Sequence, residues 1–170
     1  MRSRVAVGVA VGVAAVSAVV IVVMVVRWAT GSDRAPAPLG LPATAAVAPF
    51  AGYREVRAAV DGRCVRLVLA DTPKRRADGL HGVADLGPYA GMLFAQRDDG
   101  DTAFTMSGLA RPLDIAWFAA DGSRIGATRM APCPRGSRAD CPEYRSRGAY
   151  RFALETPAGA RLVSTIGPCL

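Results

Sequence analysis

A chain of 170 residues has room for one domain and little more, and 51% of its residues are hydrophobic. Its 21 Lys and Arg against 14 Asp and Glu give a formal net charge of +7, yet no basic run is longer than Lys74-Arg75-Arg76. Nucleic-acid-binding domains carry denser basic stripes, often with aromatic residues for stacking, so this composition argues against nucleic acid as a partner.

The N-terminal segment, residues 1–29, is predicted to be a membrane anchor. Residues 5–26 carry no charged side chain, and as a helix they would span roughly 33 Å, enough to cross a bilayer. A cleaved signal peptide is the alternative, but its apolar core usually runs only about 7–15 residues. Gly8 and Gly12 form a GxxxG pair, so a homodimer through this helix is a further possibility.

Residues 30–52 are predicted to be a linker. Four prolines prevent a continuous helix, and the alanine-rich composition offers little to pack: Pro36, Pro38, Pro42 and Pro49. The third part of the chain, residues 53–170, is then one domain.

Short apolar runs with turn signals between them recur through residues 53–170. Asp61-Gly62 and Asp121-Gly122 are hairpin signals, the first joining strands at 54–60 and 63–70 and the second joining strands at 113–119 and 124–130. Further strands are predicted at 92–95, 102–106, 150–155 and 162–166.

One helix interrupts this series of strands. Thr72 is a good N-cap, Pro73 suits the first helical position and Gly79 is placed to end the helix. The predicted fold is mainly β with one short α-helix, a compact antiparallel β-barrel or sandwich preceded by a single transmembrane helix.

All four cysteines follow the apolar segment, which favours disulfides in an extracytoplasmic domain of a single-pass protein of the cell membrane. Cys133 and Cys141 are the easiest pair, and Cys64 with Cys169 would then tie the first core strands to the C-terminus. Four cysteines allow three pairings, and four reduced thiols are the alternative. A redox pair is disfavoured, because Cys133 and Cys141 lack the CxxC spacing.

The order of short motifs resembles the family called domain of unknown function 192. The motifs are Thr72-Pro73-x-x-Arg76-x-x-Gly79-Leu80, Gly91-Met92-Leu93-Phe94, Phe104-x-Met106, Pro112-Leu113-Asp114-Ile115-x-x-Phe118, Met130-x-Pro132-Cys133, Cys141-Pro142-x-Tyr144 and Tyr150-x-x-x-Leu154-Glu155. The resemblance covers residues 63–168 and implies a small β-barrel-like domain, often exported or membrane-tethered. It implies no biochemical activity.

The chain departs from that family at two places. Ser107-Gly108 stands where the family usually has Lys-Asn, so any ligand contact made by that pair is altered here. His81 stands where the family commonly has Met. It is the chain's one histidine, and a packing or surface role is favoured over catalysis, since no metal-ligand cluster surrounds it in the sequence.

Asp114 and Glu155 are the acidic residues of interest, because each lies in an apolar strand. A structural aspartate, held by backbone N–H groups or by an arginine such as Arg111 or Arg76, is the favoured interpretation of Asp114. The alternative is the polar floor of a pocket, with Glu155 as a second carboxylate. We assign no catalytic residue, no metal ligand and no cofactor from the sequence.

The function expected from the sequence is that of a binding or interaction module of the cell envelope, with an unknown envelope ligand or protein as partner. Its predicted ligand face comprises Gly91, Met92, Met106, Arg111, Pro112, Asp114 and Glu155. One alternative is an envelope hydrolase that uses Asp114 and Glu155 as acid and base. Another is a purely structural or assembly domain.

Overall fold

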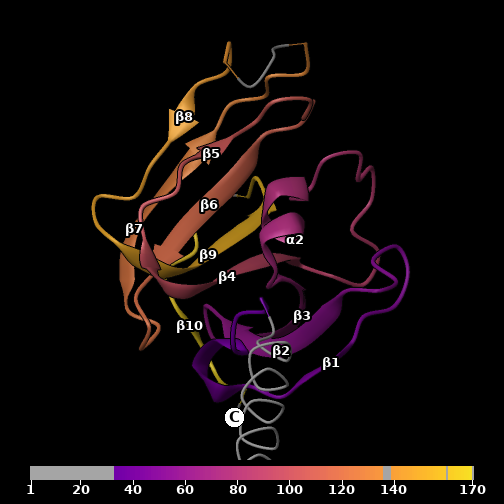
Figure 1. Ribbon diagram of the computed structural model, residues 1–170, viewed down its shortest axis with the longest axis vertical. Helices are drawn as coiled ribbons and strands as arrows, with labels where there is room; N and C mark the ends of the chain where they lie inside the picture. Colours follow the sequence, from indigo (N-terminus) through magenta and orange to yellow (C-terminus); the bar gives the residue numbers. More distant parts are fainter. Residues whose placement is uncertain (1–32, 136–138, 160, 170) are drawn as a thin grey trace, which may run out of the picture. The chain divides into compact units, whose positions relative to one another are not determined.

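The computed structural model describes residues 33–135, 139–159 and 161–169, and this part of the chain is mainly β with one short α-helix. Its main sheet has eight strands in the order β1-β2-β3-β4-β9-β6-β7, with β10 also paired to β2 (Figure 1). The strands of this sheet are β1 (Ala43–Ala45), β2 (Arg54–Val60), β3 (Arg63–Ala70), β4 (Gly91–Gly100), β6 (Leu113–Phe118), β7 (Arg124–Met130), β9 (Tyr150–Pro157) and β10 (Ile166–Gly167). A second sheet pairs β5 (Phe104–Thr105) with β8 (Glu143–Tyr144), and the helical elements are η1 (Pro38–Gly40) and α2 (Pro73–Asp78).

The sheet is open, which corrects the expected barrel. The pairings run from β1 to β7, and within the described ranges no pairing joins these two outer strands. Nor is the sheet wholly antiparallel, because β3 and β4 run parallel, with Leu67 opposite Gly91. Parallel neighbours need a long crossover connection, and residues 71–90, which include α2, provide it.

The two predicted hairpins are confirmed. Asp61 and Gly62 have φ values of 48° and 77° between β2 and β3, as a turn with two left-handed residues requires. Gly122, with φ of 86°, lies in the connection of β6 to β7, where Asp121 Oδ1 accepts a hydrogen bond from Ser123 N at 2.8 Å.

Both faces of the sheet are apolar. Along β6, Ile115 and Trp117 belong to one buried cluster, whereas Ala116 and Phe118 belong to the other. The first cluster also contains Leu80, Tyr89 and Met106 from the connections, and the second contains segments near both ends of the described chain. A strand buried on both faces reads as continuously apolar, which explains the short apolar runs in the sequence.

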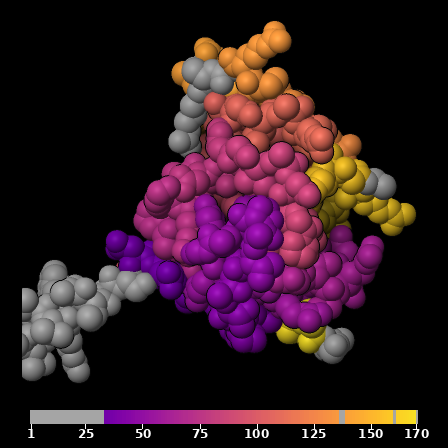
Figure 2. Space-filling model, turned by 90° about the vertical axis from the view of Figure 1, so that its right-hand side faces the viewer, coloured from indigo at the N-terminus to yellow at the C-terminus, as the bar shows by residue number. Residues whose placement is uncertain are grey.

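The described residues of the predicted linker are part of the folded unit, which runs from Arg34 to Leu170. Ala35 N donates to Asp71 O at 2.7 Å, β1 pairs with β2, and Leu41 and Phe50 are buried. The space-filling view shows these indigo residues lying directly on the magenta surface (Figure 2). The buried apolar side chains of this segment stand singly between prolines and follow no helical or strand periodicity. Its composition therefore indicated a linker.

The predicted membrane anchor at residues 5–26, with Gly8 and Gly12, lies outside the described residues. In the part of the chain that the structure describes, no helix has the length and hydrophobicity needed to cross a bilayer.

Both predicted disulfides are present. Cys64 is joined to Cys169 across 105 positions of sequence, and Cys133 is joined to Cys141 across 8. The first bridge ties the chain's end to β3, and the second closes the loop that leads from β7 to β8.

Candidate functional site

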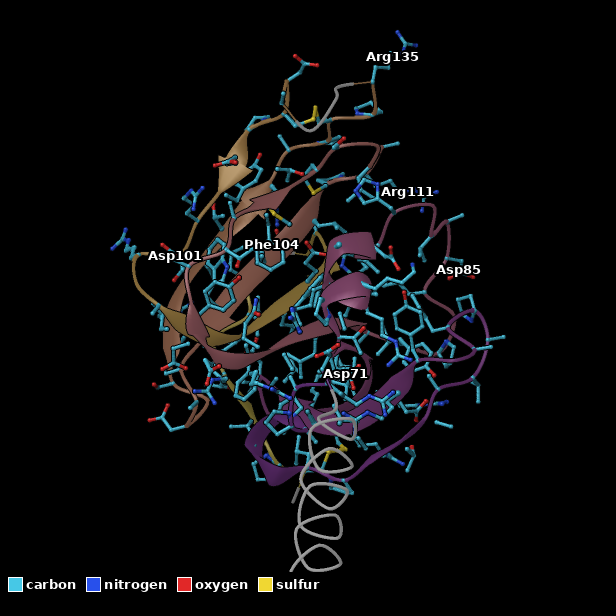
Figure 3. The ribbon with its side chains drawn as sticks, in the orientation of Figure 1. Asp71, Asp85, Asp101, Phe104, Arg111 and Arg135 are labelled. Atoms are coloured by element: carbon cyan, nitrogen blue, oxygen red, sulfur yellow. A yellow bond between two sulfur atoms is a disulfide. The ribbon has the colours of Figure 1, made fainter. Side chains whose placement is uncertain are left out.

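A cavity of about 420 Å³ lies between α2, the β4–β9 part of the sheet and the segment around β5. Figure 3 shows Phe104 of this segment beside α2. The cavity is lined by Pro73, Arg76, Ala77, Gly79, Leu80, His81, Phe94, Gln96, Thr102, Ala103, Phe104, Thr105, Ser107, Leu109 and Glu155. Its size is that of a site for a small molecule, since such pockets usually measure about 300–1,000 Å³.

Glu155 of β9 supplies the cavity's one carboxyl group. It lies opposite Met92 of β4 and Ile115 of β6, so its side chain starts from the middle of an apolar sheet face. Only 3% of the residue is exposed, and burial alone, with no hydrogen bond from another described residue, acts on its carboxyl group. Burial raises the pKa of Glu155 to about 8. At neutral pH the group is therefore a neutral acid that can donate one hydrogen bond and accept others.

Arg76 reaches the cavity from α2, which forms as the sequence predicts. The hydroxyl of Thr72 accepts a hydrogen bond from Arg75 N at 3.2 Å, and Gly79 ends the helix with φ of 53°. Arg76 Nη1 donates to Ala95 O at 3.0 Å. Among the described side chains no carboxylate forms an ion pair with Arg76, so its positive charge is not neutralised within the cavity lining.

The opposite wall is held by the Cys133–Cys141 loop. Gly108 N donates to Cys133 O and Cys133 N donates to Leu109 O, each at 3.0 Å, and Ser107 forms an isolated parallel bridge with Cys133. Gly108 has φ of +75°, and a Cβ placed on it would lie 3.2 Å from His81 Nδ1. Glycine at this position therefore lets the imidazole pack closely against the wall.

An aromatic pair covers part of the cavity. The rings of Phe94 and Phe104 are 5.0 Å apart and perpendicular, and Phe104 also lies 6.2 Å from the ring of Tyr150. The hydroxyl of Tyr150 donates to Thr102 O at 2.9 Å, which fixes the segment leading into β5. These contacts give the cavity a rigid apolar side next to its polar groups.

Asp114 is a structural residue on the other face of the sheet. Arg129 binds both of its oxygens, at 2.7 and 3.1 Å, and Gly159 N donates to it at 2.9 Å. Burial would raise the pKa of Asp114, but the hydrogen bonds from Arg129 and Gly159 outweigh burial and hold this pKa below its usual value.

The hydrolase alternative is wrong in its assigned residues. Ile115 and Glu155 are direct partners across β6 and β9 and share a face, so the neighbouring Asp114 points to the opposite face. Two carboxyl groups separated by a sheet cannot act on one substrate bond.

The predicted ligand face does not form one surface. Met92 and Met106 are fully buried in the core, and Gly91 lies against the backbone of Glu155, where a Cβ would come within 2.2 Å of Glu155 O. Of the predicted ligand face, only Glu155 lines this first cavity.

Arg111 and Pro112 line a second cavity, of about 810 Å³, formed by the connections at residues 80–89, 108–113 and 157–158. In Figure 3 Arg111 lies apart from Phe104, on a loop toward the edge of the molecule. Leu80 and Leu109 contribute to both cavities, so these two side chains form the partition between them.

The sequence analysis missed Arg76, Gln96 and Phe104 as lining residues and favoured a packing role for His81. The family motifs could have indicated Arg76 and Phe104, since several of their residues line the cavity, but Gln96 lies in none of these motifs. Over residues 33–135, 139–159 and 161–169, no group of three or more His, Cys, Asp or Glu is arranged to hold a metal ion.

Two solved structures resemble this fold. One is a candidate transcription regulator from Sinorhizobium meliloti 1021, with 26% sequence identity and a TM-score of 0.54 over 63% of this chain and 83% of that one. The other is a protein of unknown function from Novosphingobium aromaticivorans DSM 12444, with 24% identity and a TM-score of 0.59 over 79% of this chain and 95% of that one.

No curated protein matches the chain. The profile of the DUF192 family, described as Uncharacterized ACR, matches residues 56–167, which contain both cavities, most of the main sheet and the Cys133–Cys141 bridge. The chain belongs to the DUF192 family of uncharacterized proteins.

Proposed function

We propose that this domain is a small-molecule binding module of the cell envelope, with its ligand site in the cavity floored by Glu155. The observation that carries the proposal is a carboxyl group that is 3% exposed, forms no hydrogen bond with a described residue, and lines a cavity of both polar and apolar side chains. Glu155 lines the cavity, so its carboxyl group can form hydrogen bonds with a molecule bound there. A ligand with hydroxyl or amide groups can supply hydrogen bonds that no described residue makes to this carboxyl group.

The surface offers little support for a purely structural or assembly role. Such a role would favour a broad exposed apolar patch, because docking surfaces expose contiguous apolar side chains. Among the described residues, Val47 is the one large hydrophobic residue that is exposed, at 49%. An isolated side chain of this kind is ordinary on a protein surface.

The location proposed for the module is the outer side of the cell membrane, with residues 5–26 as an uncleaved anchor. The charge-free apolar run supports the anchor, and the two disulfides support an oxidising compartment. Thiol labelling of the full-length protein taken from its native membrane without reductant tests the location. The expected result is no reactive thiol, and two or more reactive thiols would contradict an extracytoplasmic domain.

Ligand-observed NMR tests the binding function on the full-length chain in detergent micelles. The probes are a fragment library of sugars, organic acids, amines and aromatic alcohols, applied to the wild type and to Ala77→Trp, whose indole would occupy the cavity. The matched control is Ala84→Trp, because Ala84 lines the second cavity. Fragments that bind the wild type and the control but not Ala77→Trp support the proposal. A library without such fragments contradicts it.

A further inference from the structure

The charged groups that line the first cavity bear on the charge of the ligand that it can bind. Its lining contains one guanidinium, Arg76, one imidazole, His81, and one carboxyl, Glu155. Arg76 donates a hydrogen bond to Ala95 O, and no ion pair joins it to Glu155 in the described structure. The guanidinium is thus able to bind an anionic group inside the cavity.

The uncharged polar groups indicate a ligand rich in hydroxyl groups. Gln96, Thr102 and Thr105 line the cavity together with Ser107, and the rings of Phe94 and Phe104 cover its apolar side. Amide and hydroxyl side chains both donate and accept, which matches alternating hydroxyl groups on a small carbon skeleton.

We propose that the ligand is a hydroxylated carboxylate of the size of a sugar acid, with its carboxylate on Arg76 and its hydroxyl groups on Gln96 and Glu155. This inference rests on the proposed function and names its ligand class. One guanidinium matches a carboxylate with two parallel hydrogen bonds. A phosphate ester carries about −1.5 to −2 charges at neutral pH and would need further cations, and an amine would be repelled by Arg76.

The protonation state of Glu155 should make the affinity for a carboxylate ligand depend on pH. The side chains directly beside it on β4 and β6, Met92 and Ile115, are uncharged, and the titratable groups that face the cavity with it are Arg76 and His81. Tyr150, behind Phe104, stays protonated because burial raises its pKa. Ionised Glu155 would place a second negative charge beside the ligand carboxylate, so anion affinity should fall as the pH rises through about 8.

Calorimetric titration of the full-length protein tests the ligand class with four sugars that share one six-carbon skeleton and differ in charge. The probes are glucuronate, glucose, glucosamine and glucose 6-phosphate. Glucuronate should bind at least about tenfold tighter than the other three at about pH 6, and its affinity should fall at about pH 9. Equal affinities, or a preference for glucosamine or the phosphate, would overturn the inference.

Three variants test which cavity binds the anion. Arg76→Gln should remove the preference for glucuronate, and Arg76→Lys should restore part of it. The matched control is Arg111→Gln, because Arg111 is exposed and lines the second cavity. Loss of the preference in Arg111→Gln instead would overturn the inference by placing the anion in the other cavity.

Glu155→Gln should flatten the pH profile of glucuronate binding, whereas an unchanged profile would contradict the link to Glu155. If no sugar binds but other fragments fill the first cavity, the ligand class is wrong and the binding function stands. If no fragment of any class fills it, both fail.

Discussion

At the scale of single residues, the two buried acids of adjacent strands show how surroundings set chemistry. Asp114 is held ionised by Arg129 and the Gly159 amide, whereas Glu155 has only apolar strand neighbours and an open cavity. Both acids have apolar neighbours in the sequence, since each belongs to a strand buried on two faces. What separates them is a cross-strand arginine, which depends on register and could not be read from either strand alone.

Glu155 should make the domain less stable as the pH rises. Its pKa is raised from 4.5 to about 8 on folding, so between these values the unfolded chain loses a proton that the folded chain keeps. As far as it depends on Glu155, the free energy of unfolding is therefore highest below pH 4.5. It declines towards pH 8 by at most about 1.4 kcal/mol per pH unit.

Glu155→Gln should remove this decline, so that the variant is more stable than the wild type at neutral pH and equal to it near pH 4.5. Chemical denaturation across that pH range measures the difference. Glu143→Gln is the control, because Glu143 is exposed and pairs with Arg145 at the surface. A constant difference across the pH range would contradict a titrating Glu155.

Gly91 should tolerate no side chain. A Cβ on Gly91 would approach Glu155 O to 2.2 Å, and the obstacle is backbone in the middle of a sheet, which cannot move aside. Gly91→Ala should lower the free energy of unfolding by about 3 kcal/mol or more. Gly100→Ala at the other end of β4 is the matched control, since a Cβ there meets nothing within 4 Å. Equal effects of the two substitutions on denaturation would be evidence against the close approach.

At the scale of elements, Asp71 joins the N-terminal segment to the sheet. This fully buried carboxylate at the end of β3 is in ion-pair distance of Arg34, Arg54 and Arg75, at 3.4, 2.5 and 2.8 Å. Arg75 also donates to Gly52 O and lies over the ring of Tyr53. One acid thus organises the segment before β1, the start of β2 and the first turn of α2.

Asp71→Asn should lower the free energy of unfolding by about 2–4 kcal/mol, because three guanidinium groups would lose their shared counter-charge. The value lies below that of a fully buried cluster, since Arg34 is 44% exposed and solvent screens it. Denaturation of Asp78→Asn supplies the comparison, because solvent screens the exposed Lys74–Asp78 pair and its loss should change the free energy of unfolding much less. If the two variants are equally stable, Asp71 does not organise the segment.

The elements that the sequence predicts well are those specified by neighbouring residues. The β2–β3 hairpin depends on Asp61-Gly62, and α2 depends on Thr72, Pro73 and Gly79, all within a few positions of the element. The parallel contact of β3 with β4 and the central place of β9 depend on pairings between distant segments. Local patterns carry no information on these pairings, so the expected barrel was wrong while its strands were largely right.

At the scale of the whole molecule, the two disulfides should contribute unequally. A bridge stabilises by restricting the unfolded chain, by about 4.7 kcal/mol for a loop of some 100 residues and by about 2.5 kcal/mol for the short loop. Cys64→Ser with Cys169→Ser should therefore destabilise the domain by about 2 kcal/mol more than Cys133→Ser with Cys141→Ser. Urea denaturation of both double variants checks the order.

The Cys133–Cys141 bridge should affect the rigidity of the cavity wall more than the free energy of unfolding of the domain. It closes the loop whose Cys133 holds Gly108 and Leu109 in place. Hydrogen exchange at these two amides should accelerate in the Cys133–Cys141 double variant and stay unchanged in the Cys64–Cys169 one. Acceleration in neither would show that the wall is held without the bridge.

The central position of β9 affects how the chain reaches its native state during synthesis. Strands β4 and β6 are both paired to β9, which comes after both of them in the sequence. Until β9 is made, the halves of the sheet on either side of it have no shared neighbour, so the apolar core cannot close. The complete main sheet of this topology can therefore assemble only after β9 has been synthesised, even though the strands on both sides of it come earlier in the sequence.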